Sequence, residues 1–192
     1  MTSFSFRKTL AFGGAALALS AGFAGFNLPA QADNTLRCDQ GALMGQFAFK
    51  SSVNNRYVKP AGLSRKLKAS QVQAPVSGTA GSFDVFKLGK EDGGHIYAFR
   101  STKNPNLWVS LDRRGSRLAL TARECTSRTK RSLFVAAPSG NGLSLRSLKT
   151  NRWVGVKPDA QLVAKYRTPN ARTQLQQVDL GSVRGLRRLN GN

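Results

Sequence analysis

The side chains able to do chemistry are few and scattered in this chain. His95 is the single histidine, and the glycines beside it favour a turn residue over a general base. One imidazole cannot build a histidine-rich zinc site, and no serine lies in a G-x-S-x-G elbow. Glycoside hydrolysis needs a pair of carboxylates, but the acids are thinly spread, and Glu91-Asp92 is typical of a solvated turn. We therefore expect no catalytic function, no metal site and no cofactor. The acids considered are Asp84, Glu91, Asp92, Asp112, Glu124, Asp159 and Asp179.

Basic side chains are the strongest remaining indication of function. The chain carries 30 Lys and Arg against 9 Asp and Glu, a formal net charge of +21. Such an excess concentrates polyanions and speeds their capture. Solubility is the alternative explanation, although a small soluble domain typically has a net charge of only about 2 to 8. The candidate ligand-binding residues are Arg113, Arg114, Arg117, Arg128, Lys130, Arg131, Lys165, Tyr166, Arg167, Arg184, Arg187 and Arg188.

Residues 1–32 have the three parts of a secretory signal peptide. The basic pair Arg7-Lys8 precedes an apolar run over residues 10–26, and Ala30-Gln31-Ala32 places the expected cleavage before Asp33. A membrane anchor is the alternative, but glycines and a serine interrupt the run and Pro29 follows it. We therefore expect an exported protein, either periplasmic or secreted.

The two cysteines are Cys38 and Cys125. In an oxidising compartment an isolated pair is most simply one structural disulfide. A reactive thiol is the alternative, but there is no C-x-x-C spacing and little prospect of a histidine partner. We predict the disulfide, which ties the mature N-terminus to the middle of the fold.

A hairpin pattern occurs three times along the chain. It reads FAFKSSVNNRYV from Phe47, YAFRSTKNPNLWV from Tyr97 and LSLRSLKTNRWV from Leu143. Each copy has alternating apolar residues, a base, a serine, a polar loop, and then an aromatic residue and valine. The aromatic residue of the second strand is Tyr57, Trp108 or Trp153, and we assign it mainly to the core. A recurrence at intervals of about 45 to 50 residues indicates one supersecondary unit used three times.

Two further strands complete each unit. The third contains Leu-x-Ala, and the fourth again alternates apolar and polar residues, as expected of half-buried strands. Three units of four strands give twelve, with almost no helix. The asparagines at the loop ends fit turn positions, because Asn tolerates the left-handed conformation. The matched positions are Leu67-Ala69, Leu120-Ala122 and Leu162-Ala164, then Phe83-Val85, Leu133-Val135 and Leu175-Val178, and the asparagines Asn55, Asn106 and Asn151.

This threefold order of motifs resembles the fascin-like β-trefoil. The resemblance covers about residues 46–180 and implies a six-strand barrel closed by three hairpins, with approximate threefold symmetry. The repeats are then expected at about 46–94, 95–141 and 142–180, after an N-terminal extension at 33–45. The Gly- and Arg-containing end, 181–192, is expected to be a basic flexible tail. The Q-x-W of ricin-type lectin trefoils is absent, which lowers the case for a ricin-like galactose site.

The expected function is that of an exported, monomeric, non-catalytic binding module. Its partner is carbohydrate or an anionic polymer: envelope polysaccharide, lipopolysaccharide or teichoic acid, or extracellular DNA. For nucleic acid, Tyr166 between Lys165 and Arg167 is the best candidate for base stacking. The alternative is a protein-interaction module, an adhesin or inhibitor that uses the trefoil loops, while actin binding would rest on analogy with fascin alone.

Overall fold

The computed structural model describes residues 35, 37–91 and 94–181. The predicted signal peptide at 1–32 and the tail residues Arg184, Arg187 and Arg188 lie outside these described residues. Over the described part, the chain forms twelve antiparallel strands and two single-turn 3-10 helices, η1 (Cys38–Gln40) and η2 (Ala171–Thr173). The strands are β1 (Ala42–Ser51), β2 (Tyr57–Ala61), β3 (Lys66–Gln71), β4 (Phe83–Glu91), β5 (Gly94–Ser101), β6 (Trp108–Leu111), β7 (Leu118–Thr121), β8 (Phe134–Ser139), β9 (Gly142–Ser147), β10 (Arg152–Val156), β11 (Leu162–Tyr166) and β12 (Leu175–Gly181).

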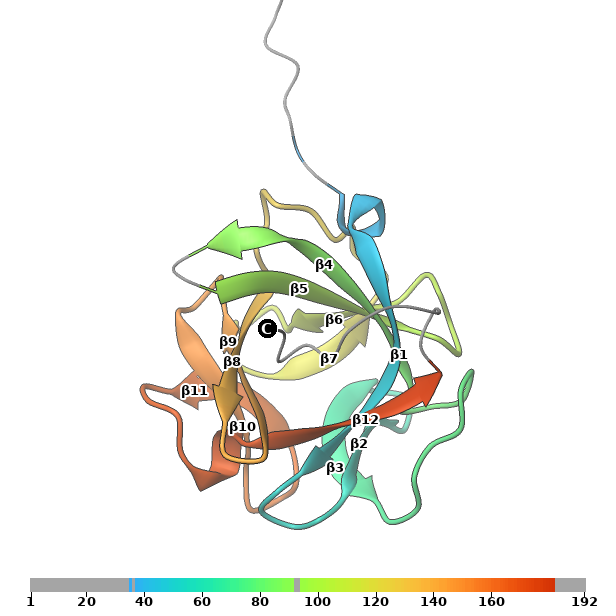
Figure 1. The fold of residues 1–192 in the computed structure, drawn as a ribbon, viewed down its shortest axis with the longest axis vertical. Helices are drawn as coiled ribbons and strands as arrows, with labels where there is room; N and C mark the ends of the chain where they lie inside the picture. The colour runs from blue at the N-terminus through green and yellow to red at the C-terminus, as the bar shows by residue number, and fades with distance from the viewer. Residues whose placement is uncertain (1–34, 36, 92–93, 182–192) are drawn as a thin grey trace, which may run out of the picture. The chain divides into compact units, whose positions relative to one another are not determined.

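Six of the strands close into a barrel. The pairs β1–β4, β4–β5, β5–β8, β8–β9, β9–β12 and β12–β1 form an unbroken ring, so the first strand of the fold pairs with the last (Figure 1). A closed ring leaves no unpaired edge among these six strands. The barrel therefore takes the first and fourth strands of each repeat.

The remaining six strands form three hairpins, β2–β3, β6–β7 and β10–β11. They meet one another through three bridges, Lys66 with Ala119, Arg117 with Val163 and Lys68 with Gln161. Each hairpin thus contacts the other two and closes one end of the barrel. The predicted three repeats of four strands are confirmed, although β1 already begins at Ala42, inside the predicted extension at 33–45.

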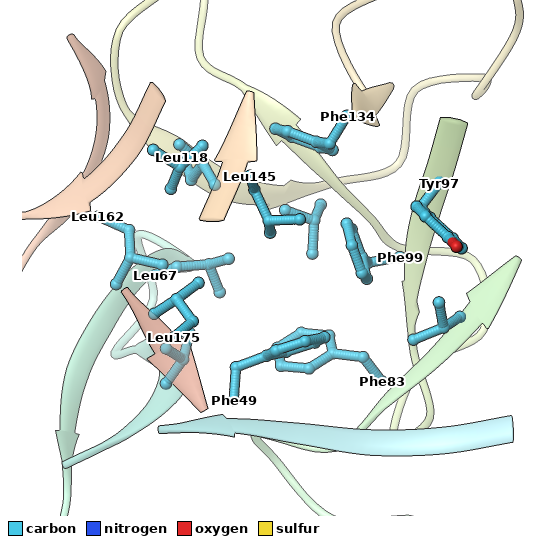
Figure 2. Close-up of a cluster of buried hydrophobic side chains, with 14 of the residues drawn as sticks. Phe49, Leu67, Phe83, Tyr97, Phe99, Leu118, Phe134, Leu145, Leu162 and Leu175 are labelled. Atoms are coloured by element: carbon cyan, nitrogen blue, oxygen red, sulfur yellow. The ribbon is translucent and has the colours of Figure 1, made fainter. Parts of the chain in front are cut away.

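The barrel interior is filled by equivalent apolar residues of the three repeats. Phe49, Phe99 and Leu145 come from the first strands, and Leu67, Leu118 and Leu162 come from the hairpins. In Figure 2 the three hairpin leucines lie at one end of the cluster and the aromatic rings toward the other. The rings of Phe49 and Phe99 meet edge to face, with centroids 5.3 Å apart, a geometry that aromatic pairs favour. The core is therefore shared by all three repeats.

The serine after the basic residue closes the first hairpin loop of each repeat. Ser51, Ser101 and Ser147 are buried, and each hydroxyl accepts a backbone N–H from the loop that follows. Asn55 and Asn151 have the expected left-handed backbone, with φ of 56° and 52°. For Asn106 that expectation was wrong. The second loop is one residue longer, and Asn104 turns it by accepting the Asn106 N–H.

The second repeat departs from the predicted register in two strands. Its third strand is β7, in which Leu118 and Leu120 face the core, and Ala122 lies beyond it, exposed. In its fourth strand the fully buried Phe134 points into the barrel, whereas Leu133 packs in a second cluster outside. Both the predicted Leu120-Ala122 and Leu133-Val135 registers were therefore wrong. Leu-x-Ala occurs only in the wrong register, as Leu120-Thr121-Ala122, and consecutive buried residues hid the alternation.

The described residues contain no helix long and apolar enough to cross a membrane.

Candidate functional site

A basic residue and an aromatic residue face each other across the first hairpin of every repeat. Lys50 pairs with Tyr57, Arg100 with Trp108, and Arg146 with Trp153. Each pair lies on the outer face of its strands, because the neighbouring Phe49, Phe99 or Leu145 points inward and strand side chains alternate. We call these pairs the basic–aromatic pairs of repeats 1, 2 and 3.

The aromatic members were predicted to belong mainly to the core, which was wrong for Tyr57 and Trp153 but right in that Trp108 is buried. The valine after each aromatic residue fills the barrel, namely Val58, Val109 and Val154. Tyr57 and Trp153 are half-buried on the outside, and Trp108 is buried in the separate outer cluster. Because a strand has a period of two, an aromatic residue and the valine after it cannot both enter the barrel.

The pair of repeat 2 is mostly covered by its surroundings. The Arg100 guanidinium lies 4.8 Å from the Phe86 ring centroid and 5.7 Å from that of Trp108. Arg100 Nη2 also forms an ion pair with Asp84 Oδ2 at 2.9 Å. Only 9% of Trp108 is exposed. The cation is thus neutralised and packed beside two rings, with 26% of the Arg100 side chain exposed.

The disulfide adds a further layer over repeat 2. Cys38 and Cys125 are bonded, as predicted, and both are buried in one cluster with Phe86, Trp108 and Leu133. The Cys38 N–H also donates to the Cys125 carbonyl at 2.9 Å. The bridge therefore fastens the segment before β1 onto the outer side of the barrel.

We expect Asp84→Asn to lower the free energy of unfolding by about 2 kcal/mol, the range for a hydrogen bond to a charged group. The substitution leaves Arg100 beside two rings without a carboxylate. Urea denaturation measures the change. Glu91→Gln is the control, because its ion pair with Lys130 is exposed on both sides and should contribute little. An equal loss in the two variants would contradict a structural role for the buried pair.

The pair of repeat 3 opens instead into a cleft of about 470 Å³. Arg146, Asn151, Trp153 and Arg167 line it, with small and apolar residues of β5 and β8 opposite. Arg146 donates from Nη1 to Asn151 Oδ1, which holds the guanidinium beside the cleft. Among the described residues that line the cleft, none is acidic. It offers an indole, two guanidinium groups and an amide.

A second cleft of the same volume lies beside the pair of repeat 2, but its charges are mixed. Arg37, Arg100 and Arg123 line it together with Asp39 and Glu124. Arg37 forms an ion pair with Asp39 at 3.0 Å. This cleft therefore shows no preference for one sign of ligand charge.

Most of the predicted basic residues lie away from the cleft of repeat 3. Arg113 and Arg114 are exposed in the turn between β6 and β7, and Arg117 is half-buried at the hairpin end of the barrel. Arg128 and Lys130 are exposed between β7 and β8, and Lys130 forms an ion pair with Glu91 at 3.2 Å. Arg131 donates to the Asp112 carbonyl at 2.7 Å.

Of the predicted residues that the structure describes, Arg167 alone lines this cleft. The neighbouring Tyr166 has a packing role. Tyr166 is half-buried, its ring lies against Gly155, and its hydroxyl donates to the Val156 carbonyl at 3.3 Å. Lys165 is exposed, with Nζ 5.4 Å from the Tyr166 centroid. Tyr166 is thus less available for base stacking than the sequence indicated.

The candidate catalytic side chains are spread over the fold. His95 lies within β5, opposite Lys90 and Ala136, and not in the predicted turn. Asp112 accepts backbone N–H groups of its own turn, and so does Asp159. In the described part of the chain, no three His, Cys, Asp or Glu residues group to hold a metal.

Comparisons with solved structures identify the fold. No family model matches the sequence, and no curated protein matches it either. Among solved structures, a designed threefold-symmetric protein, ThreeFoil, is similar over 71% of this chain and 99% of its own, with a TM-score of 0.54 and 14% identity. The fold is a β-trefoil. The agglutinin of Rhizoctonia solani is also similar, over 72% of this chain and 96% of its own, with a TM-score of 0.55 and 8% identity.

Larger proteins contain a similar trefoil as one part. This chain spans about a sixth of a mosquitocidal holotoxin, with a TM-score of 0.58 and 15% identity over 72% of the chain. It spans about a third of an α-L-arabinofuranosidase, with a TM-score of 0.55 and 14% identity. At such identities the likeness establishes the trefoil fold alone. The narrower resemblance to fascin stays a prediction.

Sequence reasoning missed three of the four polar or aromatic residues that line the cleft of this trefoil: Arg146, Asn151 and Trp153. All three belong to the repeated motif, whose residues were assigned from the sequence to packing and turns. The available signal was the Trp-Val order itself, since a valine directed inward requires the preceding tryptophan to face out.

Proposed function

We propose that this trefoil is a non-catalytic binding module for anionic polysaccharide and that the cleft of repeat 3 is its site. The observation that carries the proposal is the half-buried Trp153 in a cleft with Arg146 and Arg167 and no acidic residue among its described lining. An aromatic face packs on the apolar face of a sugar ring. The guanidinium fork matches carboxylate and sulfate groups in a bidentate manner.

The charge of the whole chain supports an anionic ligand over a neutral one. A net charge of +21 raises the local concentration of a polyanion and its rate of encounter. The exposed Arg113, Arg114 and Arg128 then contribute at longer range, outside the cleft. Affinity in this arrangement falls with salt, whereas the sugar preference comes from the cleft.

The similar structures support carbohydrate as the ligand class, since one is an agglutinin and others are trefoil-containing glycosidases. Together with the predicted export signal, this favours acidic polymers of a cell envelope or its surroundings, including lipopolysaccharide and teichoic acid. Extracellular DNA is a less favoured polyanion, because Tyr166 is packed on Gly155.

A matched pair of double variants tests the proposal. We expect Arg146→Gln/Arg167→Gln to weaken binding to polygalacturonate at least tenfold by isothermal titration calorimetry. Arg113→Gln/Arg114→Gln removes the same charge from an exposed turn and should weaken it less than threefold. Neutral dextran should bind neither double variant nor the unaltered protein. Equal weakening in the two variants would assign binding to net charge alone, and no binding at low salt to any acidic polysaccharide would refute the proposal.

A protein-interaction module is the second candidate, because four exposed apolar side chains come from the loops of repeat 1. They are Val53, Leu63, Val72 and Val76. Solvent-exposed apolar residues on one repeat favour a protein partner over a polymer. Pull-down from envelope extracts distinguishes the two, since a protein partner stays bound after nuclease and glycosidase treatment and a polymer does not.

A further inference from the structure

The residues that precede the three hairpin leucines occupy equivalent places around the barrel axis. Lys66, Arg117 and Gln161 stand directly before Leu67, Leu118 and Leu162. Each of the three pairs across to the residue after the leucine of the next hairpin: Lys66 to Ala119, Arg117 to Val163, and Gln161 to Lys68. The same pairing at all three junctions places these residues around the pseudo-threefold axis.

Their side chains leave the barrel on the face opposite the core. The three leucines are buried at one end of the cluster in Figure 2. Because side chains alternate along a strand, the residues on either side of each leucine point outward at that end. Lys68, which follows Leu67, therefore joins Lys66, Arg117 and Gln161. We call these four residues the axial cluster.

The cations of the axial cluster are not neutralised by a bonded acid. In the described structure, the side-chain nitrogens of Lys66, Lys68 and Arg117 have neither a hydrogen bond nor an ion pair, and all three side chains are half-buried. The nearby acids are held in turns. Asp112 accepts the N–H groups of Ser116 and Arg117. The three cations outnumber the two nearby acids, Asp112 and Asp159, so a net positive charge remains at this end of the barrel.

Asp159 is the second acid near the cluster. Its Oδ1 accepts the Gln161 N–H at 3.2 Å, and its Oδ2 pairs with Lys157 at 3.3 Å. The pKa of Asp159 lies below its usual value, first because of the Gln161 N–H and then because of the charges of Lys157 and Lys68. Asp159 is thus ionised but committed to its own turn.

Gln161 supplies a second and independent observation. It is only 5% exposed, and its side-chain Nε2 is buried without any acceptor among the described residues. Its backbone is satisfied, because its N–H donates to Asp159 and its carbonyl accepts the Lys157 N–H at 2.9 Å. A buried donor without a partner is costly. An acceptor from outside would remove that cost.

We propose that the axial cluster is a binding site for one tetrahedral oxyanion, phosphate or sulfate, either free or as an ester group. A tetrahedral anion has the threefold symmetry of the site, so three of its oxygens can each meet Lys66, Arg117 or Gln161. Lys68 adds a further positive charge. The fourth oxygen then points along the axis to solvent, and in an ester it is the atom that joins the anion to the rest of the ligand. This site is separate from the cleft of repeat 3.

The test is calorimetric titration of the purified protein with inorganic phosphate, inorganic sulfate and dextran sulfate oligomers at constant ionic strength. We expect one saturable site per chain, weakened at least tenfold by Lys66→Gln/Arg117→Gln. The control Lys90→Gln/Lys103→Gln removes the same charge from exposed positions and should change affinity less than twofold. Gln161→Met removes the buried amide at similar size, should weaken binding at least threefold, and decides the matter if the double variant does not fold.

The three ligands distinguish the sources of the anion. Saturable binding of inorganic phosphate or sulfate supports a free anion, and binding of dextran sulfate alone supports an ester on a polymer. No saturable site for any ligand, or equal weakening by the control, overturns the proposal. Arg146→Gln/Arg167→Gln should leave this site intact, so a failure of the proposed polysaccharide cleft is recognised separately.

Discussion

Replacing both cysteines, Cys38→Ser/Cys125→Ser, is expected to lower the free energy of unfolding by about 4 kcal/mol. The bridge joins residues 87 apart in sequence, and loops of that length restrict the unfolded chain strongly in the chain-entropy model. The bond also packs against Phe86, Trp108 and Leu133 in the outer cluster. Guanidinium denaturation followed by tryptophan fluorescence measures the change.

Reduction of the unaltered protein provides the control for this double variant. With dithiothreitol, the wild-type midpoint should fall to that of the variant, and the variant itself should not respond to the reductant. A loss below about 1 kcal/mol would contradict the prediction, because it would mean that the disulfide restricts the unfolded chain little.

The two tryptophans occupy equivalent positions in the repeat, but replacement by alanine is expected to reduce ligand affinity at one and stability at the other. Trp153→Ala should weaken polysaccharide binding about 30-fold, equivalent to about 2 kcal/mol, because it removes the aromatic face of the cleft. Trp108→Ala should instead lower the free energy of unfolding by about 3 to 4 kcal/mol, as large-to-small changes of buried aromatics do. Trp108 packs on Phe86 with ring centroids 5.4 Å apart.

Calorimetric titration and denaturation of both variants measure the two effects side by side. The folded fraction of Trp108→Ala should keep its affinity, and Trp153→Ala should unfold within about 1 kcal/mol of the wild type, since Trp153 is half-buried. If Trp153→Ala binds normally, the cleft of repeat 3 is not the polysaccharide site. If Trp108→Ala is as stable as the wild type, the outer cluster does not stabilise the fold.

The sequence predicted the architecture because the repeated motif is mostly structural. The buried serines close the same loop three times, and alternating apolar residues fill one barrel. Register was predicted correctly where alternation was clear, as in Leu67-Lys68-Ala69. It was wrong in repeat 2, where Leu118-Ala119-Leu120 is buried at all three positions and Leu133-Phe134-Val135 is buried throughout.

The candidate site was harder to predict, because symmetry relates positions without making their surroundings equal. Arg100 and Arg146 have the same place in the motif, yet Arg100 is paired with Asp84 and packed on Phe86 beside a cleft of mixed charge, whereas Arg146 lines a cleft with no acid in its described lining. The acid and the ring that cover Arg100 come from β4, in the preceding repeat. The axial cluster likewise depends on pairing between hairpins, which local sequence does not specify.

The pairing of β1 with β12 has a consequence for the order in which the chain can fold. The ring cannot close until β12 has left the ribosome, because β1 lacks one of its partners until then. Both cysteines, however, precede β9 and emerge earlier. Oxidation can thus join the first two repeats while the third is still unfinished, so the disulfide can hold these two repeats together before the barrel closes.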